Sequence, residues 1–239
     1  MTDPRRPRAL VELTLLVLWF VLFTRLAAAT GRDLAAAGTN ALALQSLEST
    51  LHLDVERSAN SWLTGHPVLG HLAVYLYRLY YVAVAGTLLW VFLRHADVYR
   101  EVRRTMVAMT VLVLPVYWAV PMSPPRFAMP GVVDIVARYD ILDHASRQSW
   151  TSPSHHTAMP SMHVGWSLWC AYAVWSALRG THPRLALVPW LFPLLMAADV
   201  LATGNHFVLD IAGSIALLAV SVAAASTGGR LVARRHTRA

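Results

Sequence analysis

The sequence predicts an all-α protein: a bundle of six membrane-spanning helices, with an amphipathic interfacial helix between the first and second spans. Of its 239 residues, 56% are hydrophobic and only 14% are charged, which is less charge than a soluble domain of this size carries. Several apolar runs approach the roughly 20 residues that a helix needs to cross a bilayer. Most of the basic residues lie between these runs, and we treat residues 1–239 as a single integral membrane domain.

Charged or proline-containing segments bound each predicted span. The first span covers roughly residues 10–29. In residues 31–65, which follow it, leucines alternate with acidic residues, as they do in a helix lying at the interface or on the outer ends of a bundle. The later spans cover approximately residues 67–93, 105–120, 160–178, 185–201 and 207–225. Residues 122–159 are too long a segment for a simple connector, which favours a lid or a substrate-contacting role.

The distribution of arginines predicts the orientation in the membrane. Six spans place both termini and the loops after the second and fourth spans on one side, and these segments carry most of the arginines. By the positive-inside rule, that side is the cytoplasm of a cell-membrane protein. The net charge of +7 does not indicate nucleic-acid binding, because the arginines punctuate apolar runs and form no single stripe.

A histidine and an aspartate four residues apart mark the start of the last span. His206 and Asp210 would lie on one face of a helix, where the carboxylate fixes the imidazole tautomer and leaves one ring nitrogen free to attack. Each ionisable group in a membrane helix costs roughly 2.5–3.5 kcal/mol, so the pair indicates chemistry. His163 and Arg126 also fall at predicted outer ends of spans, so we expect one extracytoplasmic site.

The residue types in this site suit phosphoryl transfer, because a guanidinium and helix N-termini both bind phosphate. We expect His206 to attack phosphorus, Asp210 to orient it and stabilise its positive charge, and His163 to protonate the leaving oxygen. Arg126 and the backbone N–H groups near Ser161 and Met162 would hold the phosphate oxygens. Two further residues are candidates for support. Asn205 flanks the nucleophile, and Asp199 either assists the site or bonds Thr203 and Asn205.

These segments resemble the motifs of the type 2 phosphatidic acid phosphatase superfamily. The stretch Pro160-Ser161-Met162-His163 resembles its second motif, P-S-x-H, and His206 to Asp210 resembles its third, H-x-x-x-D. Pro124-Pro125-Arg126 matches the arginine end of the first motif. The resemblance implies a six-span enzyme without a metal or other cofactor. It also implies a phosphohistidine intermediate, with His206 as nucleophile, His163 as acid and Asp210 as its partner.

Two positions depart from the usual motifs. Ala119 stands where the first motif has a lysine, and Val200 stands where the third has an arginine. The form G-N-H-F-x-x-D is closer to the inositol phosphorylceramide synthase and sphingomyelin synthase branch, whose members pass the phosphoryl-bearing group to an alcohol. The sequence therefore predicts a lipid phosphatase or a lipid phosphotransferase. Its partners would be the membrane, a lipid phosphate of the outer leaflet, and water or an alcohol as acceptor.

Three other interpretations of the same residues compete with this one. His163, His206 and Asp210 could ligate zinc in a membrane hydrolase, but no H-E-x-x-H motif is present and Arg126 beside a cation is unfavourable. A transporter would show internal repeats and polar residues at the midplane. A non-catalytic protein could use His206 and Asp210 only to join helices. Glu12, Arg25 and Arg78 fall within predicted spans, where pairing between helices is expected.

Overall fold

The computed structural model describes residues 8–139 and 156–236, with side chains as far as residue 227. These residues form helices and no strand; one isolated parallel bridge joins Met122 to Thr157. The elements are α1 (Ala9–Ala28), α2 (Leu34–Thr50), α3 (Glu56–Thr64), α4 (Pro67–Arg94), α5 (Ala96–Ala119), α6 (Pro125–Ala128), α7 (Ile135–Tyr139), α8 (Met162–Leu178), the 3₁₀ helix η3 (Leu185–Trp190), α9 (Leu191–Ala202) and α10 (Val208–His236).

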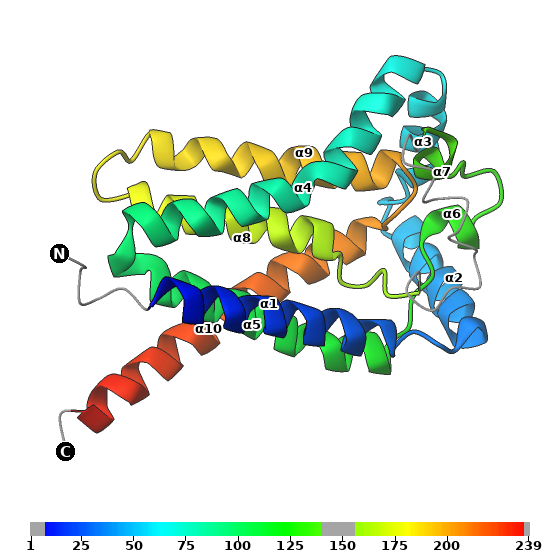
Figure 1. Ribbon diagram of the computed structural model, residues 1–239. Coiled ribbons are helices and arrows are strands. Elements are labelled where there is room, and N and C mark those ends of the chain that lie inside the picture. Colours follow the sequence, from blue (N-terminus) through cyan, green and yellow to red (C-terminus); the bar gives the residue numbers. More distant parts are fainter. Residues whose placement is uncertain (1–7, 140–155, 237–239) are drawn as a thin grey trace.

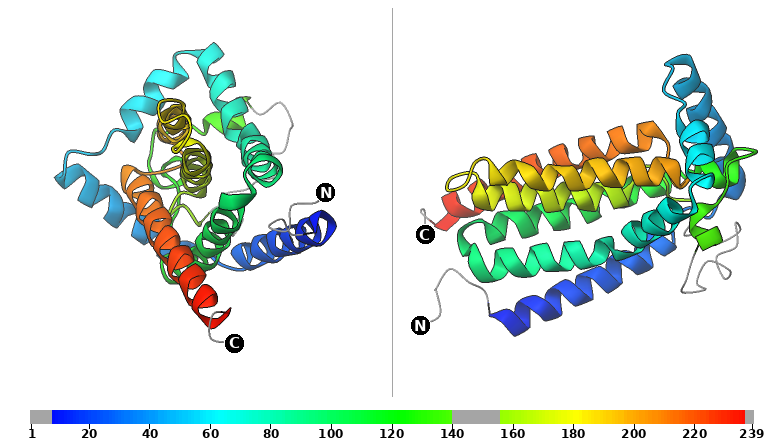
Figure 2. Two further views of the ribbon diagram at one scale, coloured as in Figure 1. Left: turned by 90° about the vertical axis from the view of Figure 1, so that its left-hand side faces the viewer. Right: turned by 90° about the horizontal axis from the view of Figure 1, so that it is seen from above.

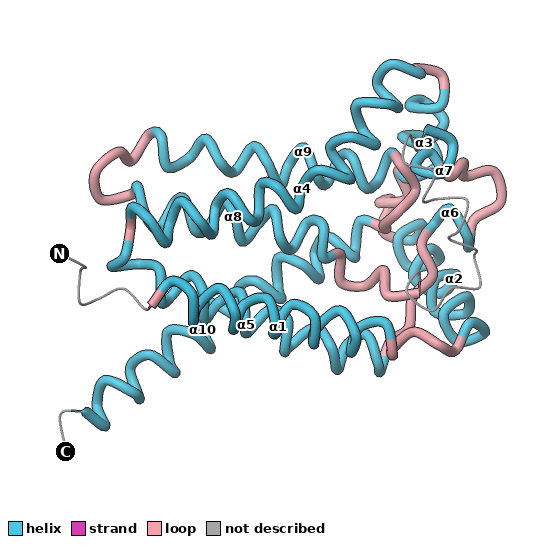
Figure 3. The backbone as a smooth tube through the Cα atoms, viewed as in Figure 1, coloured by secondary structure: helices cyan, strands magenta, loops and turns pink. Residues whose placement is uncertain are grey.

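Long helices run lengthwise through the molecule, and short ones gather at one end (Figures 1 and 2). Helices α1, α4, α5, α8, α9 and α10 form the bundle, whereas α2, α3, α6 and α7 lie across the end that Figure 3 shows to be rich in loops. Five helical segments of the described chain are long and apolar enough to cross a membrane: Ala9–Ala28, Pro67–Arg94, Ala96–Ala119, Leu185–Ala202 and Val208–Thr227. The all-helical membrane class is therefore confirmed.

Helix α8, the fourth predicted span, is not among these five segments. It has 17 residues, and every residue from Val164 to Ala173 is buried. It packs against α4, α5, α9 and α10, so protein rather than lipid surrounds this part of the helix. The prediction of six spans therefore stands on five candidate segments and one short central helix.

The segment between the first two long helices differs from the single amphipathic helix predicted for it. It forms two helices, α2 and α3, joined by a turn in which His52 adopts a φ of 56°. Leu47 is exposed, whereas Glu48 and Glu56, expected on the polar face, are fully buried. Both acids bond backbone N–H groups of α10, so tertiary contacts rather than solvent satisfy them. A location at the membrane interface stays a prediction.

Helix α1 is attached to the bundle through α5. The Glu12 carboxylate pairs with Arg103 and accepts a hydrogen bond of 2.8 Å from the Tyr99 hydroxyl. Farther along the helix, Trp19 Nε1 donates to Thr110 Oγ1 at 2.9 Å. One of the predicted intramembrane charges is thus paired between helices, as expected. These contacts fix α1 beside α5, and other residues of α1 line the cavity described below.

Candidate active site

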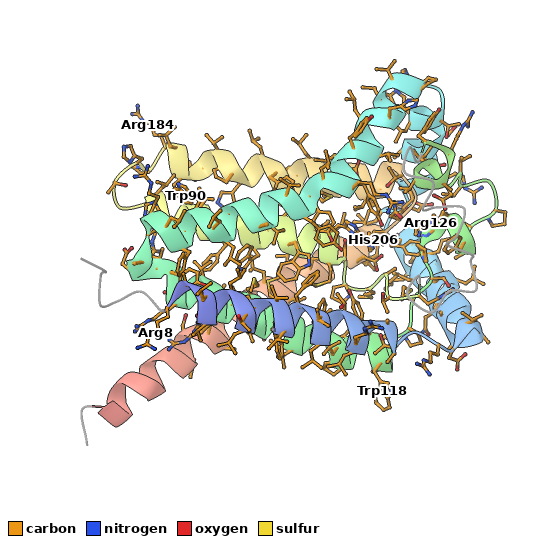
Figure 4. All side chains as sticks on the ribbon, in the orientation of Figure 1. Arg8, Trp90, Trp118, Arg126, Arg184 and His206 are labelled. Atoms are coloured by element: carbon orange, nitrogen blue, oxygen red, sulfur yellow. The ribbon has the colours of Figure 1, made fainter. Side chains whose placement is uncertain are left out.

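The predicted site residues lie at the end of the bundle that carries the short helices. Figure 4 shows Arg126 and His206 at this end, and Arg8 and Arg184 at the opposite end. This separation of the site residues from Arg8 and Arg184 agrees with the sidedness expected from the sequence.

A tight turn between α9 and α10 presents the histidine. Gly204 adopts a φ of +73°, and a Cβ atom built on it would lie 2.7 Å from Val132 Cγ1, so this position requires glycine. The backbone N–H groups of Asn205 and His206 both donate to the carbonyl of Val200, at 2.9 and 3.2 Å. Val200 is the position where the related motif has an arginine. In this protein the residue supplies a backbone carbonyl to the turn and no side-chain cation to the site.

His206 and Asp210 are in contact, but His206 precedes the helix. Helix α10 begins at Val208, so the imidazole belongs to the turn and the carboxylate to the first helical turn. His206 Nδ1 lies 3.2 Å from Asp210 Oδ2, which also accepts the backbone N–H of Phe207 at 2.9 Å. Because the carboxylate only accepts, we assign the ring proton to Nδ1. Nε2 is then the nitrogen with a free electron pair.

His163, the second residue of α8, lies close to His206. The two imidazole centroids are 6.1 Å apart. The ring of Tyr77 stacks on His163 with a centroid distance of 4.1 Å, and the ring of Tyr80 lies 4.5 Å away. These tyrosines fix the plane of the imidazole. From sequence alone, the many Trp and Tyr residues of the chain favour a role as interface anchors. The i,i+3 spacing of these two tyrosines on one helical face was the signal that could have joined them to the site.

Arg126 is held beside the same turn by backbone and side-chain contacts. The backbone N–H of Arg126 donates to the carbonyl of Gly204 at 2.9 Å, and its guanidinium donates to Asn205 Oδ1. Its Nε lies 3.2 Å from Asp134 Oδ2, an ion contact without hydrogen-bond geometry. The guanidinium carbon lies 4.5 Å from the centroid of the Phe127 ring. Asn205 therefore supports the site by orienting its arginine.

The backbone of Ser161 is used differently from the expectation. Its N–H donates to the carbonyl of Asp210 at 3.3 Å, and its carbonyl accepts from Ser214 Oγ at 2.8 Å. Its hydroxyl caps α8 by accepting the N–H of Val164. The Ser161 N–H thus joins α8 to α10, and a contact from this group to a phosphate stays a prediction. Met162, the other predicted contact, lines the cavity.

Asp199 supports the turn through its backbone. Its carbonyl accepts a hydrogen bond of 2.7 Å from the Thr203 hydroxyl, which in turn accepts from Asn205 Nδ2 at 2.7 Å. Of the two alternatives left open by the sequence, the geometry favours the structural one. The link runs from the Asp199 carbonyl and not from its carboxylate, whose Oδ2 is buried without a hydrogen-bond partner among the described residues.

One cavity of about 260 Å³ brings these groups together. His163, His206, Arg126 and Asn205 line its polar part. Much of the remaining wall comes from apolar and aromatic side chains of α1 and α4, namely Phe20, Phe23, Ala27, Ala28, Tyr77, Tyr80 and Tyr81, and Tyr117 of α5 and Met162 and Trp166 of α8 also line the cavity. The site therefore combines a polar end, suited to an anion, with an apolar wall. No sequence signal assigned α1 to it.

Burial controls the charge of His206. The side chain is only 7% exposed, and this burial, reinforced by the positive charge of Arg126, lowers the pKa of the His206 imidazole to about 3. A hydrogen bond with the Ala158 backbone raises the pKa of His206 but does not offset these two effects. The imidazole is consequently neutral near pH 7, and only the neutral ring has an electron pair for attack on phosphorus.

The segment between α5 and α8 is described in part. It contains α6 and α7, and the bridge from Met122 to Thr157 joins its ends. Residues 140–155 of the predicted lid, which include Asp140, Asp143, His144 and His155, lie outside the described residues. Within the described parts of the chain, no three or more His, Cys, Asp or Glu side chains form a group that could hold a metal ion.

Comparison with known proteins identifies the family. The chain matches no curated protein and no solved structure. The sequence model of the PAP2 superfamily, however, matches residues 42–224. This range contains Arg126, His163, His206 and Asp210, whereas α1 lies outside it. Because the match covers well over half of the chain and includes every residue that carried the motif resemblance, this protein belongs to the PAP2 superfamily.

Proposed function

We propose that this protein is a lipid phosphatase or lipid phosphotransferase that works through a phosphohistidine on His206. Superfamily membership suggests phosphatase or phosphotransferase activity. The observation that carries the finer proposal is the single cavity lined by both imidazoles, Arg126 and the apolar wall of α1. A phosphate ester of a lipid has the matching shape, with a charged group at one end and a hydrocarbon chain at the other.

In the first step, His206 Nε2 donates its electron pair to phosphorus, and the bond from phosphorus to the leaving oxygen breaks. His163 gives its proton to that oxygen, so the lipid alcohol departs neutral. The negative charge of the bound phosphate favours the protonated form of His163 that this step requires. Arg126 balances charge on the equatorial oxygens, and Asp210 stabilises the imidazole as it becomes positively charged.

In the second step, an acceptor oxygen attacks phosphorus and the bond to Nε2 breaks. His163, now neutral, removes the proton of the acceptor, and His206 returns to its initial state. With a phosphomonoester donor, water as the acceptor gives free phosphate and an alcohol gives a new phosphate monoester. With a phosphodiester donor such as an inositol phospholipid, water gives a water-soluble phosphate monoester and an alcohol gives a new phosphodiester. The two outcomes share the phosphohistidine and differ only in which hydroxyl reaches it.

The departures from the usual motifs favour the transferase outcome as the second candidate. Ala119 and Val200 occupy the positions of two cations that bind phosphate in the related motifs. A site with less positive charge holds free phosphate less well, and a substrate that also binds through its lipid part depends less on those cations. We therefore include in this proposal transfer to an alcohol, the type of acceptor used by the inositol phosphorylceramide synthase-like branch.

For the topology we propose six spans, with α8 as the short fourth one. Both termini would then face the cytoplasm and the cavity would open at the extracytoplasmic surface of the cell membrane. The arginine distribution supports this orientation. Nucleoside triphosphates are scarce on that side, so phosphatidate-like lipids, polyprenyl phosphates and inositol phospholipids are the donors to test.

Turnover of labelled lipids by the purified protein in nanodiscs tests the proposal. We expect ³²P from one of these lipid classes to appear as free phosphate or as a phosphorylated alcohol, with EDTA present throughout. His206→Ala should abolish turnover, and protein labelling should be lost with it. Turnover by this variant within about tenfold of wild type would contradict nucleophilic catalysis. Free phosphate as the sole product, whatever alcohol is added, would eliminate the transferase outcome.

A further inference from the structure

Two buried glutamates cap the helix that follows the nucleophile. Glu56 Oε1 accepts the backbone N–H of Val208 at 3.0 Å, and Glu48 Oε1 accepts the N–H of Leu209 at 2.6 Å. With Asp210 Oδ2 on the N–H of Phe207, three consecutive N–H groups before and within the first turn of α10 each meet a different carboxyl group. Both glutamates have no exposed surface.

The second oxygens of the two glutamates have no donor. Glu48 Oε2 and Glu56 Oε2 are buried and lack a hydrogen-bond partner among the described residues. The two carboxyl groups are nevertheless close enough to each other to form a hydrogen bond when one of them is protonated. Two ionised carboxylates would repel there because both are negatively charged, and neither could donate a hydrogen bond to the other. One proton between them removes the repulsion and satisfies both oxygens.

We propose that Glu48 and Glu56 are positioning residues of the active site: sharing one proton, they hold the first turn of α10 and thereby the His206–Asp210 pair. The first turn carries Asp210, and His206 lies two residues before it. A shift of this turn moves the imidazole relative to His163 and Arg126, and small misplacements of a nucleophile cost large factors in rate. This assignment rests on the proposed function for its link to turnover.

The charges around the pair favour retention of the proton on Glu48. Burial, followed by the hydrogen bond and charge of Glu56 and the charge of Asp210, raises the pKa of Glu48 to about 8, although the Leu209 N–H lowers it. Helix α6 packs on α2, and helices α9 and α4 pack on α3; the titratable or charged residues of these three helices nearest this end of the bundle are Arg126, Asp199 and His71. Arg126 is engaged with Asn205 and Asp134, and His71 lies against Tyr139.

The sign of the pH effect on folding follows from this pKa. Glu48 titrates near 4.5 when unfolded and near 8 when folded, so folding takes up a proton between these values. The contribution of Glu48 to the stability of the folded state is full below about pH 4.5 and declines as the pH rises towards 8. We expect this contribution alone to lower the apparent Tm in nanodiscs by several degrees over this range, measured as the difference between the wild type and Glu48→Gln.

The test compares Glu48→Gln with Glu48→Ala. Glutamine keeps an oxygen for the Leu209 N–H and supplies an N–H to Glu56, so Glu48→Gln should lose this pH dependence and keep kcat within about threefold. Glu48→Ala should lower kcat about 100-fold or more with little change in KM. Glu101→Gln is the matched control, because Glu101 accepts a hydrogen bond from Tyr172 on another part of the bundle. It should resemble wild type in both measurements.

Each outcome decides one part. A Glu48→Gln variant whose Tm keeps the wild-type pH dependence overturns the shared proton, and this measurement needs no substrate. A Glu48→Ala variant with kcat within threefold of wild type overturns the positioning role. If Glu48→Ala does not fold, a Glu48→Gln variant with kcat lowered about 100-fold overturns the positioning role instead, because glutamine keeps the oxygen that accepts the Leu209 N–H. Absence of turnover by wild type with every lipid phosphate contradicts the proposed function and leaves the Tm test valid.

Discussion

Replacement of Asp210 by asparagine tests the partnership on which nucleophilic attack depends. Asp210 Oδ2 lies 3.2 Å from His206 Nδ1, and the ring gains a positive charge when Nε2 bonds to phosphorus. A hydrogen bond to a charged group contributes about 1.5–3 kcal/mol, which corresponds to about 10- to 150-fold in rate. We therefore expect Asp210→Asn to slow phosphoenzyme formation by about 100-fold.

The fold should tolerate this substitution. Asparagine retains an oxygen that can accept the N–H of Phe207, and Asp210 Oδ1 has no hydrogen-bond partner among the described residues that the change would remove. The assay is rapid-quench measurement of ³²P-labelled protein under alkaline conditions, with the apparent Tm measured in parallel. An Asp210→Asn variant that forms labelled protein within threefold of the wild-type rate would refute the role given to this carboxylate.

Three further predictions concern the turn, the nucleophile and the cavity wall. Gly204→Ala should lower the apparent Tm by several degrees, because it combines a φ of +73° with a 2.7 Å approach to Val132; Gly180→Ala, in open space, is the matched control and should have little effect. The lowered pKa of His206 makes the folded state lose stability as the pH falls from about 6.5 towards 3, and a His206→Gln variant should lack this contribution to the acid sensitivity of Tm. Ala27→Trp should raise KM at least tenfold for a long-chain lipid phosphate and leave a short water-soluble phosphate ester unaffected; equal losses for both would contradict a lipid-binding wall.

The chemical centre could be predicted from the sequence because its signals are local. Pro160 and Gly204 mark the ends of helices, and the arginines separate one end of the bundle from the other. His163 and His206 then fall at the same end by topology alone. The structure places their rings 6.1 Å apart, as this reasoning requires. The roles of acid and nucleophile remain predictions that the experiments above address.

The supporting residues could not be predicted, because their partners are remote in the sequence. Glu48 lies 161 residues before the N–H group that it accepts. An acidic residue on a helix between leucines indicates a solvated face, since periodicity does not distinguish water from a helix N-terminus as the partner of a carboxylate. For the same reason, Tyr77 and Tyr80 appeared as interface anchors until the structure placed them against His163.

The arrangement separates recognition of the lipid chain from the chemistry. The residues proposed to act on phosphorus lie within residues 42–224, which match the superfamily, whereas Phe20, Phe23 and Ala27 of α1 line the cavity from outside that range. The hydrogen-bonding and ionic contacts described for α1 reach α5 and no residue that touches phosphorus in the proposed mechanism. Substitutions on the cavity face of α1 should therefore change KM according to chain length and leave kcat nearly constant. Substitutions that remove the contacts of Asp210 or Glu48 should lower kcat and leave KM nearly constant.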